Sequence, residues 1–116
     1  MSAQRITKRA MTVEELEAGM KAGRVNVLDV RGAGEWESGH LPGVPNIPLG
    51  YLQERWAELP PDGPVVVHCQ SGGRSAIAIS LLQARGREAI NLAGGYDAWV
   101  RAGKPTELGT AVGAGA

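Results

Sequence analysis

The sequence predicts an α/β protein with a central, mostly parallel sheet and helices on both faces. Three apolar, largely β-branched runs at residues 25–30, 65–68 and 88–92 alternate with segments of helical pattern. Such runs are typical of strands that are buried on both faces. Strand–helix alternation favours right-handed crossovers between parallel strands, so we expect three layers. The 116 residues suit one domain, since domains commonly contain about 100–150 residues.

The first helix is predicted over residues 11–23, "MTVEELEAGMKAG". Thr12 is the expected N-cap, and Glu15 stands three residues later, as in a capping box. Gly23 suits the left-handed position that ends many helices. The apolar face of this helix is expected to consist of Val13, Leu16 and Met20. A short edge strand is expected to begin near Ile6.

A long connection is predicted between the strand at residues 25–30 and the next helix. Its sequence, "RGAGEWESGHLPGVPNIPLG", is rich in glycine and proline, which favour turns. "YLQERWAEL", residues 51–59, then predicts a short amphipathic helix with Leu52, Trp56 and Leu59 on its apolar face. "PPDG" ends that helix before the second strand.

The second half of the chain predicts two more helices. Residues 75–86 form one, with Ile77, Leu81 and Leu82 expected to face inward and Gly86 ending it. Residues 96–103 form the last, after the strand at 88–92 and the turn "AGG". We expect the domain to cover residues 1–105. The remainder, residues 106–116, has low complexity and predicts a flexible tail.

Composition argues against several classes of function. The chain has 12 basic and 12 acidic residues, so no basic field favours nucleic acid or a membrane surface as partner. No apolar run approaches the roughly 20 residues of a spanning helix, and the first ten residues lack the apolar core of a signal peptide. One cysteine cannot form an internal disulfide or a cysteine-based zinc site. We therefore expect a reducing, cytoplasmic setting.

The stretch "VVVHCQSGGRSAIAISLL" holds the only cysteine of the chain, Cys69. Cys69 directly follows a predicted strand, and ligands of parallel sheets bind beyond the carboxyl ends of the strands. A lone cysteine is often just a small buried residue. The glycines and the arginine that follow favour a reactive thiol instead, because the thiolate is the nucleophilic form of cysteine.

Three features of this loop are expected to lower the pKa of Cys69. The helix predicted to begin near Ser75 presents partial positive charge at its N-terminus. Gly72 and Gly73 can adopt backbone angles that turn several N–H groups inward as an anion cradle. Arg74 adds a permanent cation with forked donors. The same groups would stabilise an anionic substrate or a sulfur atom bound to Cys69.

With these residues in view, the sequence resembles the single-domain rhodaneses, whose active loop reads C-x-x-G-x-R, usually followed by Ser. Here it reads "CQSGGRS". "LDVRGAGEWESGHLPGVPNIPL" is similar to a second family signature, and "LAGGYDAWVRAGKP" to the closing one. The three motifs occur in order and cover about residues 11–105. Val44 stands where the family usually has alanine.

The resemblance implies a rhodanese-like fold and a sulfurtransferase. The Cys69 thiolate would take a sulfane sulfur from thiosulfate, a persulfide or a polysulfide, and would pass it to cyanide or a thiol. No metal or organic cofactor is implied, and the acceptor must come from outside the chain, because no second cysteine exists to form a disulfide. Gln70 and Ser71 stand where some members carry basic residues, which makes persulfides and polysulfides comparable donors to thiosulfate. The implied substrate-binding residues are Gln70, Ser71, Gly72, Gly73, Arg74 and Ser75.

Asp29, Arg31 and His68 are expected to support this loop. Asp29 and Arg31 end the first long strand and could approach the site. Pairing within the loops is favoured, of Arg31 with Glu35 for example, and would hold the long connection in place. His68 could act as a base or a cation beside the thiolate, but orienting the loop through a ring N–H is favoured. His40 lies in the "GHLPG" turn, where we expect a structural role. Packing in the core or at its rim is the expected role of Trp36, Trp56 and Trp99.

Alternative functions share the same residues. A persulfide carrier in a sulfur relay would use the loop identically but would serve a partner protein. A phosphatase or arsenate reductase has a similar loop with one residue more between the cysteine and the arginine, whereas this chain has "QSGG" there. An inactive binding module is disfavoured, because such modules usually lose the cysteine.

Overall fold

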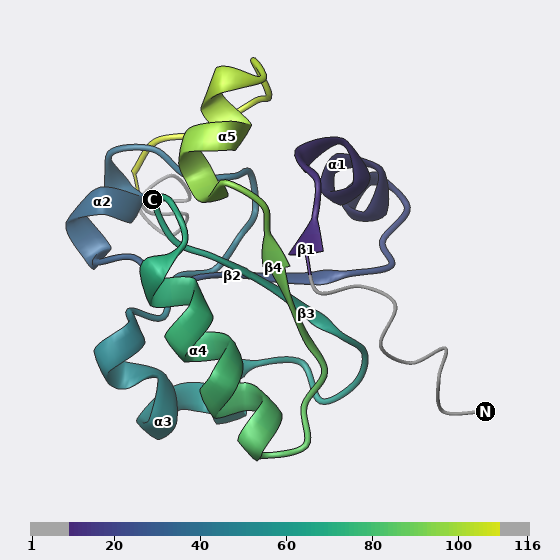
Figure 1. The fold of residues 1–116 in the computed structure, drawn as a ribbon. Helices are drawn as coiled ribbons and strands as arrows, with labels where there is room; N and C mark the ends of the chain where they lie inside the picture. Colours follow the sequence, from purple (N-terminus) through teal and green to yellow (C-terminus); the bar gives the residue numbers. More distant parts are fainter. Residues whose placement is uncertain (1–9, 110–116) are drawn as a thin grey trace.

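A four-stranded parallel sheet forms the centre of the molecule (Figure 1). The computed structural model describes residues 10–109. The strands lie in the spatial order β1-β4-β3-β2, and every neighbouring pair is parallel. The four strands are β1 (Ala10–Met11), β2 (Asn26–Asp29), β3 (Val65–His68) and β4 (Ala89–Leu92). The predicted parallel sheet is confirmed. The strand predicted to begin near Ile6 lies outside the described residues, and the edge strand that the structure shows is β1.

Helices cover both faces of the sheet, as predicted. On one face lie α1 (Val13–Lys21) and α5 (Gly95–Arg101), and on the other lies α4 (Gly73–Ala84) (Figure 1). Adjacent residues of β3 point to opposite faces, as strand geometry requires. Val65 and Val67 join the apolar cluster beneath α4, and Val66 joins the cluster beneath α1 and α5. The core is therefore split into two parts by the sheet.

Helix α1 begins as its sequence predicts. The Thr12 hydroxyl accepts the backbone N–H of Glu15 at 3.1 Å, and the Glu15 carboxylate accepts the N–H of Thr12 at 2.9 Å. This capping box satisfies two backbone donors that would otherwise lack partners at the helix start. Val13 and Leu16 are buried against the sheet.

The connection between β2 and β3 contains more helix than the sequence suggests. A five-residue helix, α2 (Ala33–Glu37), lies within the stretch predicted as loop. The predicted helix at residues 51–59 is divided into η2 (Leu49–Tyr51), α3 (Leu52–Arg55) and η3 (Trp56–Glu58). Gly32 and Gly34 obscured α2, because glycine disfavours helix interiors.

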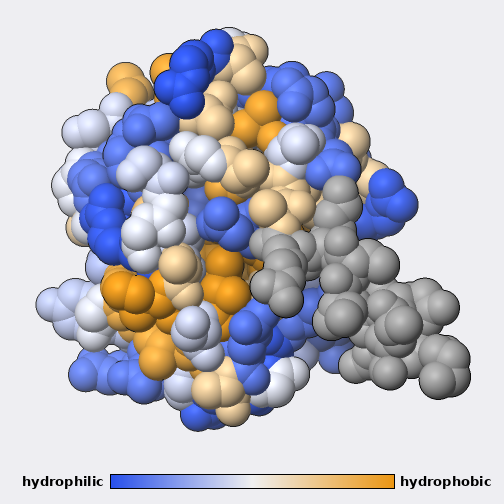
Figure 2. All heavy atoms as spheres, viewed as in Figure 1, coloured by the Kyte–Doolittle hydropathy of each residue, from blue (hydrophilic) through white to orange (hydrophobic). Residues whose placement is uncertain are grey.

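Helix α4 differs from its prediction in its start and in its buried face. It begins at Gly73, two residues before the predicted position. Ile77 was expected to face inward but is 54% exposed, while Ser75, Ala78 and Leu82 are buried. Apolar residues occupy several sides of this helix, so periodicity could not identify the buried side. Figure 2 shows hydrophobic residues gathered over the region of α4 and α3.

Residues 45–49 cover the outer edge of β2. The Asp29 N–H donates to the Pro45 carbonyl, and the Ile47 N–H donates to the Asp29 carbonyl, both at 3.0 Å. The Leu49 N–H donates to the Val30 carbonyl at 3.1 Å. This covering segment bonds the edge of β2 that faces away from its strand neighbour β3.

Ordered contacts continue past residue 105, where the domain boundary was predicted. Glu107 and His40 exchange two backbone hydrogen bonds, at 2.8 and 2.9 Å, and the Gly109 N–H donates to the Glu37 carbonyl at 2.7 Å. The first residues of the predicted tail therefore pack on the domain, while residues 110–116 lie outside the described part. Among residues 10–109, no helix combines the length and apolar character needed to cross a membrane.

Candidate active site

Cys69 lies at the carboxyl edge of the sheet, immediately after β3, and its sulfur contacts the N-cap residue of α4, Gly72. Only 2% of the residue is exposed, and it contacts the apolar cluster beneath α4. The following residues are more open, with Ser71 and Gly73 exposed. The sulfur atom therefore lies just below a loop surface that is accessible to solvent.

Backbone donors surround the Cys69 sulfur. The Gly72 N–H donates to Sγ at 3.1 Å, and the Ser75 Oγ lies 3.6 Å from Sγ. Burial alone would raise the pKa of the Cys69 thiol, but hydrogen bonds from Ser75, Gly72 and Ser71 outweigh it and lower that pKa. Hydrogen bonds to the charged form of a group favour that form. The site therefore favours the thiolate.

Gly72 has a backbone conformation that other residues rarely adopt. Its φ is 147°, and it occupies the N-cap position of α4. Gly73, by contrast, is the first helical residue and has no positive φ. Of the two glycines predicted to shape the cradle, Gly72 is the one whose conformation turns an N–H group toward the sulfur.

Arg74 forms an ion pair with Glu35 of α2. Its Nη1 lies 2.7 Å from Oε1, and its Nη2 lies 3.0 Å from Oε2. The predicted pairing of Arg31 with Glu35 is therefore wrong. Sequence separation misled the prediction, since Glu35 stands four residues from Arg31 but 39 residues from Arg74.

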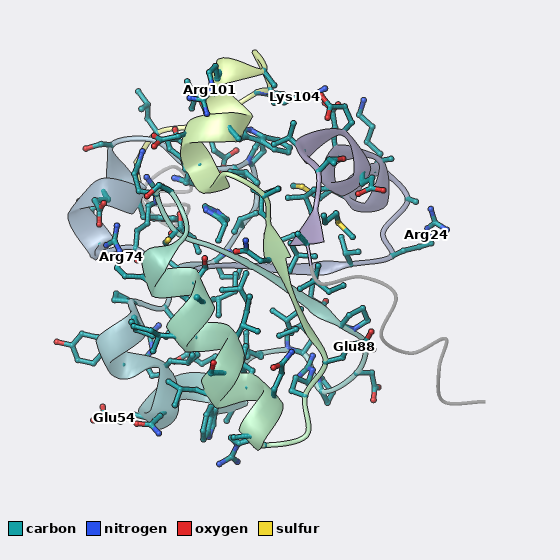
Figure 3. The ribbon with its side chains drawn as sticks, in the orientation of Figure 1. Arg24, Glu54, Arg74, Glu88, Arg101 and Lys104 are labelled. Carbon is teal, nitrogen blue, oxygen red and sulfur yellow. The ribbon has the colours of Figure 1, made fainter. Side chains whose placement is uncertain are left out.

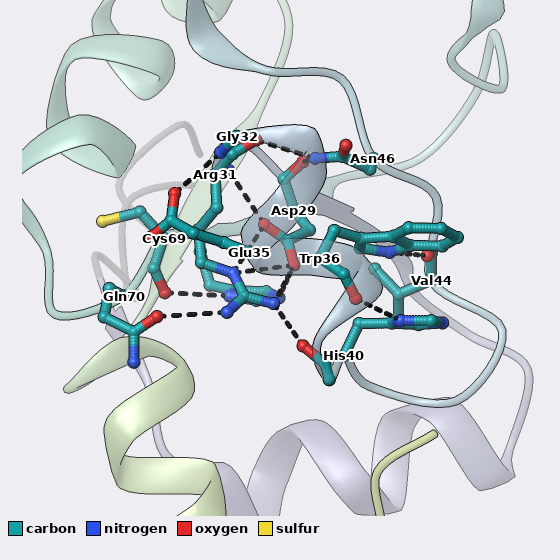
Figure 4. A network of polar contacts seen from close by, with 12 residues as sticks. Asp29, Arg31, Gly32, Glu35, Trp36, His40, Val44, Asn46, Cys69 and Gln70 are labelled. Carbon is teal, nitrogen blue, oxygen red and sulfur yellow. Dashed lines mark hydrogen bonds and ion pairs between the residues drawn. The ribbon is translucent and has the colours of Figure 1, made fainter. Parts of the chain in front are cut away.

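Arg31 lies at the centre of a buried polar network (Figure 4). Its Nε and Nη2 donate to the Asp29 carboxylate, with a shortest distance of 2.8 Å. Nη2 also donates to the Gly39 carbonyl at 2.7 Å, and Nη1 donates to Gln70 Oε1 at 3.1 Å. The guanidinium stacks over the Tyr96 ring at 4.1 Å. Arg31 thus contacts the loop directly through the Gln70 side chain, and Asp29 contacts Arg31.

His68 is fully buried and holds the Cys69 backbone. Its Nδ1 lies 3.0 Å from the Cys69 carbonyl oxygen, and a carbonyl only accepts, so Nδ1 carries the proton. Burial lowers the pKa of His68 and outweighs the nearby Asp29 carboxylate, which raises it. The ring is therefore neutral, as the favoured orienting role requires. Among residues 10–109, the Nε2 atom finds no hydrogen-bond partner, and it lies 3.7 Å from Asp29 Oδ2.

The remaining candidates are packing residues. His40 stacks on Trp36 at 3.8 Å, and its Nδ1 lies 2.7 Å from the Trp36 carbonyl oxygen. Trp99 is buried in the core, and Trp56 lies under the Arg85 guanidinium at 3.6 Å.

Sequence reasoning missed the contribution of α5 to the site. The N–H groups of Tyr96 and Asp97 donate to the carbonyls of Cys69 and Gln70, at 2.9 and 3.0 Å. The Asp97 carboxylate also accepts the side-chain amide of Gln70 at 2.5 Å. Gly95 permits this approach, because a Cβ there would lie 2.8 Å from the Cys69 carbonyl oxygen. The paired glycines of "AGGYD" were the available signal, since such pairs often mark a close backbone contact.

Within the part of the chain that the structure describes, no group of three or more His, Cys, Asp or Glu side chains could hold a metal ion. The arrangement instead presents one activated thiol below a ring of N–H groups. Such a site can attack an electrophilic sulfur and can stabilise the anion that results.

Comparisons with known proteins agree with this geometry. The rhodanese-like domain model matches residues 12–102. "Uncharacterized protein YqhL" of Bacillus subtilis is 41% identical over 97 residues, which are 83% of this chain and 75% of that protein. "Putative sulfur carrier protein YrkF" of Bacillus subtilis is 38% identical over 65% of this chain and 41% of its own length. "Sulfurtransferase" of Allochromatium vinosum is 37% identical over 70% of this chain and 77% of its own length.

A solved structure supports the same assignment. The rhodanese-related protein from Thermoplasma volcanium has a TM-score of 0.80 and 33% identity, and the match covers 86% of this chain and 98% of that one. The predicted rhodanese-like α/β fold is thereby confirmed. The family model spans most of the described residues and includes Cys69 and its loop. The chain belongs to the rhodanese-like domain family.

Proposed function

We propose that this protein is a sulfurtransferase that carries a sulfane sulfur as a persulfide on Cys69. Membership in the family and the similarity to a protein named sulfurtransferase support sulfur transfer in general. The observation that carries the proposal is the 3.1 Å contact from the Gly72 N–H to the Cys69 sulfur. That contact, with those of Ser71 and Ser75, lowers the thiol pKa and would equally stabilise a persulfide anion.

The first step loads the sulfur. The Cys69 thiolate attacks the outer sulfur of the donor, a new S–S bond forms, and the S–S bond of the donor breaks. The donor remainder leaves with the electron pair, as sulfite from thiosulfate or as a thiolate from a persulfide. The loop residues Gln70 to Ser75 bind the donor, and the N–H groups at the start of α4 stabilise the negative charge.

The second step unloads the sulfur. Cyanide or an external thiolate attacks the outer sulfur of the Cys69 persulfide, the S–S bond breaks, and Cys69 leaves as the thiolate. Products are thiocyanate or a new persulfide. Since the sulfur is carried covalently, the reaction needs no metal or organic cofactor.

The experiment that tests this proposal is intact-mass measurement after incubation with each donor separately. Thiosulfate, glutathione persulfide and polysulfide are the donors, and Cys69→Ser is the control. We expect the wild type to gain one sulfur atom with at least one donor and to lose it to cyanide. Loading of Cys69→Ser, or no loading of the wild type by any donor, would overturn the proposal.

A sulfur-relay carrier is the second candidate. The name of the Bacillus subtilis relative, putative sulfur carrier protein, favours it. Such a carrier would hold its persulfide stably against cyanide and small thiols and would transfer it quickly to one partner protein. The rate at which the loaded protein loses sulfur to cyanide distinguishes the two functions. A half-life of seconds supports the enzyme, and a half-life of hours supports the carrier.

A further inference from the structure

The ion pair between Arg74 and Glu35 lies beside the Cys69 loop, and Glu35 foremost, with the charge of Cys69 also contributing, raises the pKa of Arg74. Arg74 lies in the first turn of α4 and Glu35 in α2, and two short contacts join their side chains. Figure 3 places Arg74 at the start of α4, on the side of α2. The two side chains remain 39% and 38% exposed. An anion that enters the loop from solvent therefore meets this pair.

Glu35 is held firmly in the ionised state. Its Oε1 accepts the N–H of Gly32 at 2.9 Å in addition to the Arg74 contact. These hydrogen bonds, mainly that of Arg74, lower the pKa of Glu35 to about 2. The carboxylate consequently stays charged throughout the pH range in which a thiolate reacts.

The positive charges near the loop are thus already neutralised. The Arg31 guanidinium is buried against the Asp29 carboxylate, and the Arg74 guanidinium is paired with Glu35. Each pair has no net formal charge. The attraction of the loop for anions then comes from its backbone N–H groups, whose dipoles suit a single negative charge better than two.

We propose that Glu35 is a specificity residue that disfavours dianionic sulfur donors and directs the site toward donors with one negative charge or none. A dianion at the loop would have to share the Arg74 guanidinium with a fixed carboxylate and would be repelled by it. This inference rests on the proposed sulfur transfer and adds to it the charge class of the donor.

Two donors with the same reacting bond test the effect of charge. Thiosulfate is a dianion whose leaving group is sulfite, and methanethiosulfonate is a monoanion whose leaving group is methanesulfinate. In both, the Cys69 thiolate forms an S–S bond to the outer sulfur, and the bond from that sulfur to the sulfonyl group breaks. The leaving group departs with the electron pair.

The decisive variant is Glu35→Gln, which removes the charge and keeps an oxygen for the Gly32 N–H and for Arg74 Nη1, while Nη2 loses its acceptor. We expect kcat/KM for thiosulfate to rise roughly three- to fivefold, through a lower KM, since exposed ion pairs are worth up to about 1 kcal/mol. The constants for methanethiosulfonate should change by less than about twofold. Added salt should reduce the gain, because it screens exposed charges.

Glu37→Gln is the matched control. It removes the same charge from the same helix, but residues two apart on a helix do not share a face. We expect no change in preference between the donors for this variant. Three results would overturn the inference. The first is a Glu37→Gln variant whose kcat/KM for thiosulfate rises as much as that of Glu35→Gln. The others are a Glu35→Gln variant whose kcat/KM changes equally for both donors, and one whose kcat/KM for thiosulfate does not change.

Failure of folding and failure of the proposed function are both recognisable. A misfolded Glu35→Gln variant would melt earlier and would lose loading with both donors, which would make Glu35 a structural brace and refute the specificity role. If instead wild-type Cys69 takes sulfur from neither donor nor from a persulfide, the proposed function itself fails.

Discussion

The Tyr96 backbone N–H donates to the Cys69 carbonyl oxygen at 2.9 Å. The next N–H, that of Asp97, donates to the next carbonyl, that of Gln70, at 3.0 Å. Helix α5 therefore binds the backbone of the reactive loop from behind, while the start of α4 faces the sulfur. The loop is held on both sides by helix N-termini, and its geometry depends on how closely α5 can approach.

Gly95→Ala should disrupt this approach. A Cβ at residue 95 would lie 2.7 Å from the Gln70 carbonyl oxygen, and φ is +62°. We expect a loss of roughly 2 kcal/mol or more in the free energy of unfolding, from strain and steric overlap, and slow loading of Cys69. Chemical denaturation and intact-mass kinetics measure the two effects. Gly34→Ala is the control, because its φ is not positive and its Cβ would meet nothing within 4 Å. Equal stability of the two variants would contradict the argument.

Ser75→Ala should raise the pKa of the Cys69 thiol. The backbone and side chain of Ser75 both lower that pKa, and alanine keeps only the backbone donor. Ultraviolet thiolate absorbance against pH measures the shift. Ser80→Ala is the matched control, since the Ser80 hydroxyl bonds the Ala76 carbonyl on an exposed part of the same helix. A thiol pKa that is unchanged or lowered in Ser75→Ala would show that the hydroxyl does not stabilise the thiolate.

His68 should make stability depend on pH below about 6.5. Burial lowers the pKa of this ring from its ordinary value of 6.5, so the unfolded chain binds a proton that the folded chain does not. The free energy of unfolding should therefore be highest above pH 6.5 and should fall as the pH decreases, by at most about 1.4 kcal/mol per unit from this group. His68→Asn keeps a donor near the position of Nδ1 but does not titrate. Urea denaturation across this range should give a flatter profile for the variant, and parallel profiles would refute the assignment.

Arg74→Lys should slow sulfur loading far more than it destabilises the fold. Lysine keeps the charge but lacks the planar fork, so it cannot hold Glu35 and a bound donor with separate N–H groups at the same time. The pair is exposed, so the loss of unfolding free energy should be at most about 1 kcal/mol. We expect the loading rate to fall by roughly tenfold or more, as misplaced catalytic groups commonly cause. Arg101→Lys, on exposed helix surface, is the control, and near-normal kinetics in Arg74→Lys would mean that charge alone suffices.

Loop length should exclude phosphoryl chemistry. Four residues, "QSGG", separate Cys69 from Arg74, and a phosphoryl group has three equatorial oxygens that need donors around them. A shorter loop forms a narrower ring that suits one sulfur atom. We expect sulfur transfer to cyanide without hydrolysis of an aryl phosphate. Insertion of one residue between Gly72 and Gly73 should weaken sulfur transfer. If the wild type hydrolyses an aryl phosphate efficiently and Cys69→Ser does not, the protein is a phosphatase and the prediction is wrong.

The sequence predicted the sheet, the capping box of α1 and the position of Cys69, because each depends on local pattern. Strand runs, the Thr12 and Glu15 pair and the glycine loop are all readable within a few residues. The same reasoning failed for Arg31 and Glu35, whose partners are chosen by the fold. Two arginines, Arg31 and Arg74, compete for carboxylates near the loop, and the fold decides between them by placing Glu35 of α2 beside Arg74 of α4.

The buried side of α4 and the contact of α5 with the reactive loop could not be predicted from the sequence for a similar reason. Ile77 stands on a helix with apolar residues on several sides, so which side meets the sheet depends on how α4 is rotated over β3. The contact of Gly95 with the Cys69 carbonyl joins segments that are distant in sequence. The glycine pair predicts that another part of the backbone approaches closely, but it does not predict which part.

The segment at residues 45–49 has a consequence for assembly. Exposed edges of sheets invite strands from other molecules, which leads to aggregation. Here the outer edge of β2 is already occupied near Asp29, and the covering segment contains Pro45 and Pro48. Proline has no N–H and cannot take part in a regular ladder of bonds. Strand addition at the Asp29 end of the β2 edge is therefore blocked by the chain itself.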